Sequence, residues 1–467
     1  MLGYLAYDTG FGLDPVDQSF VNPLGLGFTI LMGVLLIALP RRYALVPVIM
    51  LTCFMTMGQA IVVLGLHFNM IRILALFGWA RLLVRGEIRA LRLNSIDKTL
   101  LWWTLSSVVL NTLLWHTADA LTNRLGQAYN ALGMYFLFRF LVRDFDDVKR
   151  VFKIAAVLII PLAAAMVEER LTGRNPFAAF GVRNAIVQIR EGALRCSGPF
   201  EVPMLAGTFA ATLLPFFVAL WQQGRADRLL SGLAILSSGT ILLTTASSGP
   251  YLTALVAVAG LLLWPWRKYM RTLRWAVVLV LITLQLIMKT PVWFVLAKID
   301  VVSGSTGWHR AYLIDRAVAT FWQWWLLGTK TTAIFGEQIH GDITNEYVWQ
   351  GVNGGVLTMI SFILIIVNCF RRIGRIEART DVSLPVRCCV WAMGAALFAH
   401  AITFLSISYF DQNFVNWYLL LALISMAPGG TLTKKRRKQV PESQIQAPAS
   451  IGAAVTAPAP VNFRGIQ

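Results

Sequence analysis

Two short polar clusters beside predicted helix starts have side chains suited to binding an anion. The first runs from Arg195 to Pro203 and includes Glu201, and the second runs from Thr244 to Tyr251 and includes Ser247 and Ser248. The guanidinium of an arginine is planar, permanently charged and suited to phosphate oxygens. We therefore predict that Arg195 binds a pyrophosphate group and that the carboxyl and hydroxyl side chains of the two clusters support it.

A third cluster brings cations, acids and a base into one long segment. Arg310 and Arg316 are further candidate ligands for a pyrophosphate, and the candidate catalytic residues are Glu337, His340 and Asp342. A histidine, or a carboxyl group with a shifted pKa, can take a proton from an acceptor hydroxyl near neutral pH. Which of the three is the general base stays open. Asn345 and Tyr347 follow the cluster and are predicted to support the site by orienting it.

The sequence carries no pattern typical of a metal or nucleotide site. It has no metal-binding Asp-x-Asp motif, no zinc-like Cys/His spacing and no glycine-rich nucleotide loop. Stabilising a phosphate-type anion requires either a metal or fixed cations. The clustered arginines favour fixed cations, so we expect neither a metal nor another cofactor.

The composition is that of a membrane protein with many helical spans. Hydrophobic residues make up 57% of the 467 residues and charged ones only 14%, and the mean hydropathy is +0.64. Apolar runs long enough to cross about 30 Å of hydrocarbon recur along the chain. We predict an all-α fold with about 12–13 transmembrane helices. The predicted spans lie near residues 24–39, 44–65, 69–84, 98–115, 125–142, 151–167, 203–221, 229–246, 250–266, 273–290, 345–369, 387–408 and 413–427.

The net charge of +18 follows the predicted topology and does not indicate nucleic-acid binding. Most Arg and Lys residues fall in short loops on one side if the N-terminus is outside and the C-terminus is in the cytoplasm. Arg139, near a span end, is predicted to extend toward that cytoplasmic side. The integral domain then covers residues 1–430, and residues 431–467 form a disordered cytoplasmic tail.

Two long loops, at about residues 168–202 and 289–344, lie on the outer side in this topology. Loops of this length usually serve function. The second is predicted to contain a helix between Trp308 and Phe321. The first opposes the bias of basic residues toward the cytoplasm, which indicates an anionic substrate at the outer face. Its arginines are Arg170, Arg174, Arg183, Arg190 and Arg195.

The order of these patches resembles that in the O-antigen ligase and polysaccharide polymerase superfamily of bacterial inner-membrane proteins. The shared features are an Arg-x-x-Gly-x-x-x-x-Pro patch before a span, a small-residue turn and a large outer loop. That loop holds an early arginine, Trp325 to Thr329 and Asn345, and the glycine-rich stretch from Gly351 to Leu357 follows it. The resemblance covers roughly residues 168–372.

This resemblance implies a GT-C-like glycosyltransferase in the inner membrane, with a periplasmic N-terminus and periplasmic long loops. Its donor would be an undecaprenyl-pyrophosphate-linked glycan, and its activity would be polymerisation of lipid-linked repeat units. Candidate further partners are membrane lipids, chain-length regulators and export proteins. Three alternatives stay open: ligation of glycan to lipid A core or another acceptor, a flippase or transporter for the same lipids, and a non-catalytic scaffold of an export complex.

The sequence departs from the family pattern in two places, and the second departure favours the polymerase or a ligase-like relative acting on exopolysaccharide. The family often has Ser-Arg-Gly in the second patch, whereas this chain has Ser247-Ser248-Gly249. Ligases commonly place a histidine directly before the asparagine, whereas Thr344 precedes Asn345 here.

Overall fold

The structure, a computed structural model, describes residues 21–63, 66–181, 186–190, 192–298, 307–336 and 343–427, together with residues 459 and 465. The chain divides into Met1–Gly429 and Gly430–Gln467, and the fold described below belongs to the first unit. Helical residues make up 76% of the structure, which confirms the predicted all-α class. The candidates Glu337, His340 and Asp342 lie outside the described residues, as do Arg183 and nearly all of the predicted tail.

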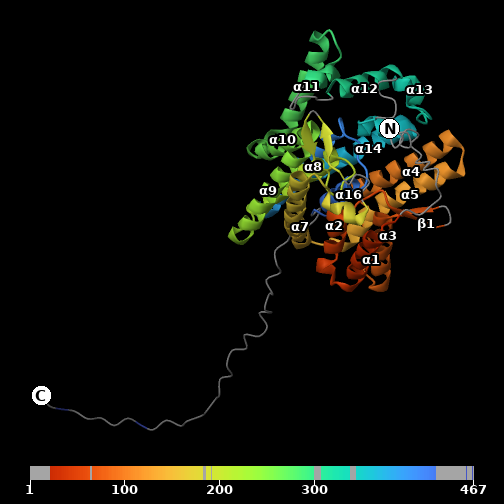
Figure 1. Ribbon diagram of the computed structural model, residues 1–467. Helices are drawn as coiled ribbons and strands as arrows, with labels where there is room; N and C mark the ends of the chain where they lie inside the picture. The colour runs from red at the N-terminus through yellow and green to blue at the C-terminus, as the bar shows by residue number, and fades with distance from the viewer. Residues whose placement is uncertain are drawn as a thin grey trace. The chain divides into compact units, whose positions relative to one another are not determined.

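The first half of the unit is built from seven helices and a short hairpin, most of which are labelled in Figure 1. The helices are α1 (Pro23–Ala38), α2 (Leu45–Phe54), α3 (Met70–Val84), α4 (Ser95–Trp115), α5 (Ala118–Ala128), α6 (Met134–Leu141) and α7 (Phe145–Thr172). The π-helical turn η3 (Tyr129–Gly133) joins α5 to α6. Local sequence fixes several helix starts: Asn94 forms a capping box with Asp97 at α4, and Asp144 caps α7.

The second half contains a second hairpin and the remaining helices. Strands β3 (Gln188–Arg190) and β4 (Ala193–Arg195) pair antiparallel. The helices are α8 (Pro203–Trp221), α9 (Arg225–Thr245), α10 (Ser248–Leu262), α11 (Met270–Ile287), α12 (Gly307–Ala319), α13 (Phe321–Trp324), α14 (Glu346–Glu377), α15 (Leu384–Thr403) and α16 (Gln412–Met426). Short 3₁₀ helices are η2 (Arg41–Tyr43), η4 (Pro176–Phe180), η5 (Trp264–Tyr269), η6 (Val292–Lys298) and η7 (Ala333–Phe335).

Each of the thirteen predicted spans contains helix, but one prediction is wrong over half its length. The span predicted at 44–65 ends as α2 at Phe54, and strands β1 (Ala60–Val63) and β2 (Leu66–Asn69) follow. Gly58 takes a positive φ of 86°, which helix cannot accommodate. The β-branched residues Ile61 to Val63 then favour a strand.

Fewer of the described helices are long enough to cross a membrane than the 12–13 spans predicted from the sequence. Within the described residues, six helical segments are long and apolar enough to cross a membrane. They are Phe145–Thr172, Pro203–Trp221, Arg225–Thr245, Trp264–Ile287, Glu346–Glu377 and Leu384–Thr403. The chain is thus a polytopic helical membrane protein, and the count of 12–13 spans stays a prediction. In the segment that contains α11 no residue is buried, as expected of a helix that faces lipid.

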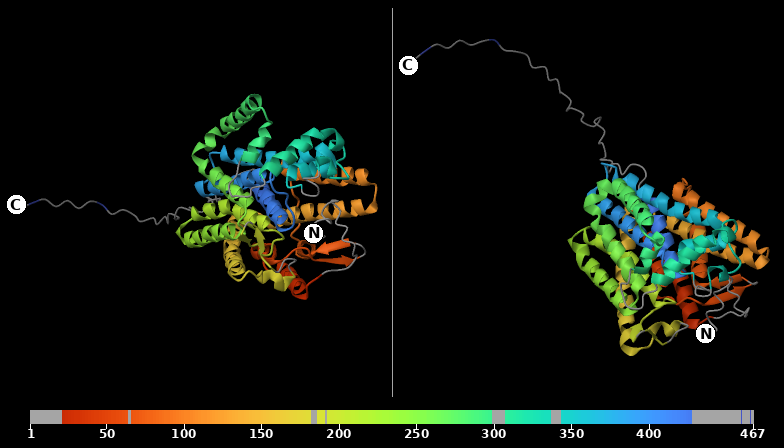
Figure 2. Two further views of the ribbon diagram at one scale, coloured as in Figure 1. Left: turned by 45° about the horizontal axis from the view of Figure 1, so that its top comes forward. Right: turned by 90° about the horizontal axis from the view of Figure 1, so that it is seen from above.

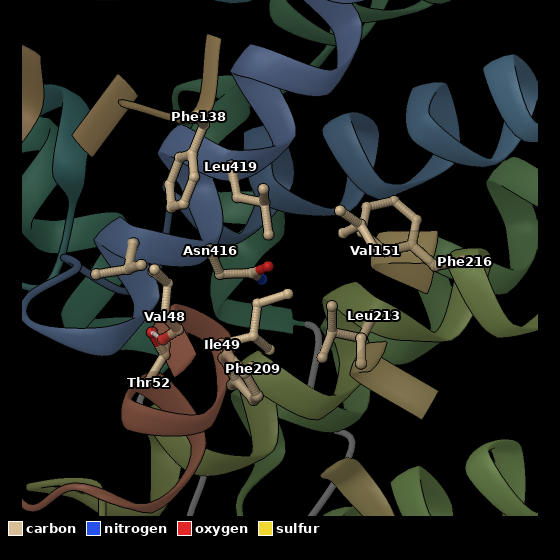
Figure 3. Close-up of a pocket in the computed structure, with 12 residues that line it drawn as sticks. Val48, Ile49, Thr52, Phe138, Val151, Phe209, Leu213, Phe216, Asn416 and Leu419 are labelled. Carbon is tan, nitrogen blue, oxygen red and sulfur yellow. Dashed lines mark hydrogen bonds between the residues drawn. The ribbon is translucent and has the colours of Figure 1, made fainter. Parts of the chain in front are cut away.

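A large hydrophobic core runs through the unit, and Figure 2 shows the helices packed around it from two further directions. One small cavity of about 20 Å³ lies between α2, α6, α7, α8 and α16. Its walls are mostly apolar, with Asn416 near the centre of the view (Figure 3). Asn416 donates to the Thr212 hydroxyl at 3.0 Å. A space of this size holds about one water molecule, so it is packing space and not a substrate site.

The glycine-rich stretch at the start of α14 lets another segment approach its backbone. Gly354 and Gly355 depart from helical geometry, and a Cβ on Gly355 would stand 2.3 Å from the carbonyl oxygen of Leu326. The Val356 N–H donates to the Trp325 carbonyl at 2.7 Å, and the Thr329 N–H donates to the Val352 carbonyl at 3.0 Å. The kink therefore fixes Trp325, Leu326 and Thr329 of the second long loop against the start of α14.

Close packing of α8 against α10 depends on Gly207, and we expect Gly207→Ala to be destabilising. A Cβ at this position would lie 2.6 Å from Pro250 Cβ and 2.9 Å from Thr245 Oγ1. Overpacking of this kind costs about 1–3 kcal/mol, which a lower midpoint of thermal unfolding in detergent would report. Gly239→Ala in α9 is the control, because, apart from its chain neighbours and the backbone of its own helix, no heavy atom of the described residues lies within 4 Å of its Cβ position. An equal loss in both variants would contradict the packing argument.

Candidate functional site

The first two polar clusters meet at the connection between α9 and α10. This connection consists of Ala246 and Ser247, and Ala246 has a left-handed backbone with φ 42°. The Arg195 Nη2 donates to Ser247 Oγ at 2.5 Å, and the N–H of Cys196 donates to the Thr244 carbonyl at 3.0 Å. The end of β4 is thereby fixed to the start of α10, and Arg195 reaches the small-residue turn.

A buried carboxylate holds the segment after Arg195 in place. Glu169, near the end of α7, accepts hydrogen bonds from the N–H groups of Ser197 at 3.0 Å and Gly198 at 2.8 Å. The side chain of Asn175 donates to the Gly198 carbonyl at 2.7 Å. Glu169 is absent from the predicted site; its signal in the sequence is the acidic pair Glu168–Glu169 directly before the first loop arginine. Its role is to position Arg195.

Arg310 comes from the third cluster and reaches the same turn. Its Nη2 lies 3.6 Å from the point where a Cβ on Gly249 would stand, so the missing side chain leaves room for the guanidinium. The helix that carries it, α12, is held by a small hydrophobic cluster containing Leu313, Trp324 and Val348. The predicted helix in the second long loop is therefore present, and it delivers a cation to the start of α10.

Arg310 is a buried cation without an acidic partner among the described residues. Its side chain is 8% exposed, and burial lowers its pKa from the usual value without a compensating acid. Within the described part of the chain, the structure gives Arg310 no ion pair, and its buried Nε has no hydrogen-bond partner. The first N–H groups of α10 add partial positive charge, because helix N-termini attract anions.

The other described candidates lie around this turn or away from it. Ser248 begins α10 and is half-buried, and Glu201 is half-buried in the bend before α8. Asn345 caps α14 by accepting from the Val348 N–H, and Tyr347 donates to the Ala401 carbonyl at 2.7 Å. Both therefore act by positioning the start of α14.

Arg316 does not join Arg310. The two residues are six positions apart on α12, which places their side chains on different sides of the helix. Arg316 is half-buried, and within the described residues its buried Nε has no hydrogen-bond partner. The prediction that Arg316 binds a pyrophosphate stays a prediction.

A second buried carboxylate, Glu346, holds segments that pack beside the start of α10. It is fully buried and accepts from the Gln350 side chain at 2.6 Å and the Tyr409 N–H at 2.9 Å. The Tyr409 hydroxyl lies 2.8 Å from His400 Nδ1. An acid inside a predicted span is the signal that identifies Glu346 from sequence. Through its bond to Tyr409, Glu346 holds the segment between α15 and α16 in place. The same segment places Ile407 beside Gly249.

No protein-family model matches this chain, and no curated protein sequence matches it. The relation to the O-antigen ligase and polymerase superfamily therefore stays a resemblance carried by the quoted residues. What the structure adds is the convergence of three distant segments on one turn.

Proposed function

We propose that this protein is a GT-C-like transferase that joins undecaprenyl-pyrophosphate-linked glycan units at the outer, periplasmic face of a bacterial inner membrane. One observation carries the proposal: Arg195 and Arg310 come from two separate loops and meet at the N-terminus of α10. Two guanidinium groups and a helix N-terminus match the charge of a pyrophosphate. The six long apolar helices supply the membrane setting that a lipid carrier requires.

The chemistry of the proposed reaction needs charge stabilisation and one proton acceptor. The bond between the anomeric carbon and the pyrophosphate oxygen breaks, and the acceptor hydroxyl oxygen forms the new glycosidic bond. Arg195 and Arg310 would stabilise the diphosphate that leaves on the lipid carrier. The hydroxyl proton passes to a base, for which the candidates remain Glu337, His340 and Asp342. The products are an extended glycan and the free carrier pyrophosphate.

Rigid positioning of the arginines supports catalysis over simple headgroup attraction. Arg195 is oriented by Ser247, and the segment beyond it is held by Glu169. Arg310 is fixed by the packing of α12. Fixed donors aimed at developing charge stabilise a transition state without reorganising during the reaction. Flexible surface arginines would serve lipid attraction equally well and would need no such support.

The test is the distribution of glycan among carrier, secreted and lipid A-attached pools after the gene is deleted. The deletion is complemented with wild type, Arg195→Ala or Arg174→Ala. Arg174 is the matched control, because it lies in the same loop and its side chain is exposed. We expect single repeat units to accumulate on the carrier, and long chains to return with wild type and Arg174→Ala only.

Other outcomes would redirect or reject the proposal. Long chains that persist on the carrier but are missing from their acceptor would make the protein a ligase. Repeat units trapped on the cytoplasmic side of the membrane would make it a flippase. A glycan distribution unchanged by the deletion, or restored equally by Arg195→Ala, would reject the transferase site.

A further inference from the structure

A basic pocket lies at the opposite end of the helices from the Arg195–Arg310 site. It has a volume of about 440 Å³ and lies between the α3–α4 connection, α6, α14 and the end of α16. Four of its lining residues are Arg89, Arg92, Arg139 and Arg372. From Glu346 near the first site to Arg372, α14 extends on the order of 40 Å at 1.5 Å per residue. The pocket is therefore separate from the proposed transferase site.

Positive charge in this pocket exceeds the negative charge around it. Among the described residues, Asp97 faces these guanidinium groups and pairs with Arg139 at 3.2 Å. Asp147 also attracts Arg89, but it is already paired with Arg41 and Arg150. Arg372 donates to the carbonyls of Ile424 at 2.9 Å and Ala427 at 2.7 Å. Neighbouring acids are already engaged: Glu87 pairs with Arg81. The cations at the pocket are thus largely uncompensated.

Two of the arginines direct donors at a weak acceptor. Arg139 Nη1 lies 2.7 Å and Arg89 Nη2 lies 3.7 Å from the sulfur of Met426. Arg89 Nη2 also lies 3.5 Å from the neutral backbone carbonyls of Arg139 and Val142. A thioether is a poor acceptor for a guanidinium. Burial, and after it repulsion from Arg143 and Arg139, lowers the pKa of Arg89. These donors lack the anionic acceptor that arginines at such a place normally have.

The surroundings of the pocket favour a lipid as the source of that anion. Leu91 and Leu93 line it beside the arginines. Leu83 and Val84, at the end of α3 just before the lining segment, are 68% and 79% exposed. Exposed apolar side chains at a helix end suit acyl chains, and basic pockets between membrane helices suit anionic headgroups. A free phosphate ion would gain nothing from the leucines.

We propose that this pocket binds the phosphate of an anionic membrane lipid, in the leaflet opposite the Arg195–Arg310 site. The guanidinium groups of Arg89 and Arg92 contact the phosphate, and the acyl chains extend past Leu93 and the end of α3. Arg139 remains paired with Asp97 and contributes through Nη1, whose present acceptor is the sulfur of Met426. The proposal is independent of the transferase activity, because it uses no residue of that site.

The test measures binding of phosphatidylglycerol to the purified full chain in neutral detergent, from the rise in unfolding midpoint with lipid concentration. Arg89→Gln/Arg92→Gln is compared with Arg371→Gln/Arg375→Gln, which removes the same charge from exposed positions near the same end of α14. We expect the first variant to bind the lipid roughly tenfold or more weakly. The control should retain wild-type affinity.

Each remaining outcome would overturn the proposal. If both double variants have the same affinity for phosphatidylglycerol, the lipid is attracted by general surface charge and not by this pocket. If phosphatidylcholine binds as tightly as phosphatidylglycerol, the pocket does not recognise an anion. Saturable stabilisation by inorganic phosphate that matches the lipid would make the pocket a site for the free ion. Arg92→Gln alone, at an exposed side chain, keeps the test valid if the double variant does not fold.

Discussion

Arg310→Met is expected to lower transferase turnover about a hundredfold and to make the protein more stable. The turnover falls because removing one fixed donor at a developing anion costs about 10²–10³ in rate. The stability rises because Arg310 is buried without an acidic partner among the described residues. Replacing an uncompensated buried charge by an apolar side chain of similar length stabilises by about 1–3 kcal/mol. Glycan synthesis in complemented cells and the unfolding midpoint in detergent measure the two effects.

The opposite signs of these two effects separate a binding role from a structural one. Natural sites often retain a strained or uncompensated group because function requires it. Arg174→Met is the control: its side chain is exposed, so neither activity nor stability should change. If Arg310→Met lowers stability and leaves activity intact, Arg310 is a structural residue and the proposed site is wrong.

Asp97→Leu is expected to destabilise the protein by about 3–5 kcal/mol, because it leaves Arg139 buried without its carboxylate. Asp97 is fully buried and Arg139 is 4% exposed. The carboxylate accepts from the Tyr135 hydroxyl at 2.5 Å, from Arg139 at 3.2 and 3.3 Å, and from the Asn94 N–H at 2.7 Å. Unfolding by denaturant in mixed micelles measures the loss.

The double variant Asp97→Leu/Arg139→Met identifies the cause of that loss. With both charges removed, most of the stability should return, because the unpaired cation is gone. About 1 kcal/mol should remain lost, since the capping box at the start of α4 no longer forms. A double variant as unstable as Asp97→Leu would show that packing, and not the isolated charge, sets the cost.

The position of Arg139 illustrates where local reasoning fails. From sequence, an arginine near a span end is predicted to extend toward the cytoplasmic surface. The structure instead buries it against Asp97, which lies in another helix. The predicted span at 44–65 fails for a related reason: hydropathy registers an apolar run, whereas Gly58 and the pairing of β1 with β2 decide its backbone.

The sequence by itself determined the helical class, the position of nearly every helix and the membrane character. These follow from local properties: the length of an apolar run, its caps, and the glycines and prolines at its ends. Only the tertiary structure decided that Arg195, Ser247 and Arg310 share one turn, and that Glu169 and Glu346 hold the segments around it. Contacts between distant segments depend on how helices pack, and no periodicity within one segment encodes that packing.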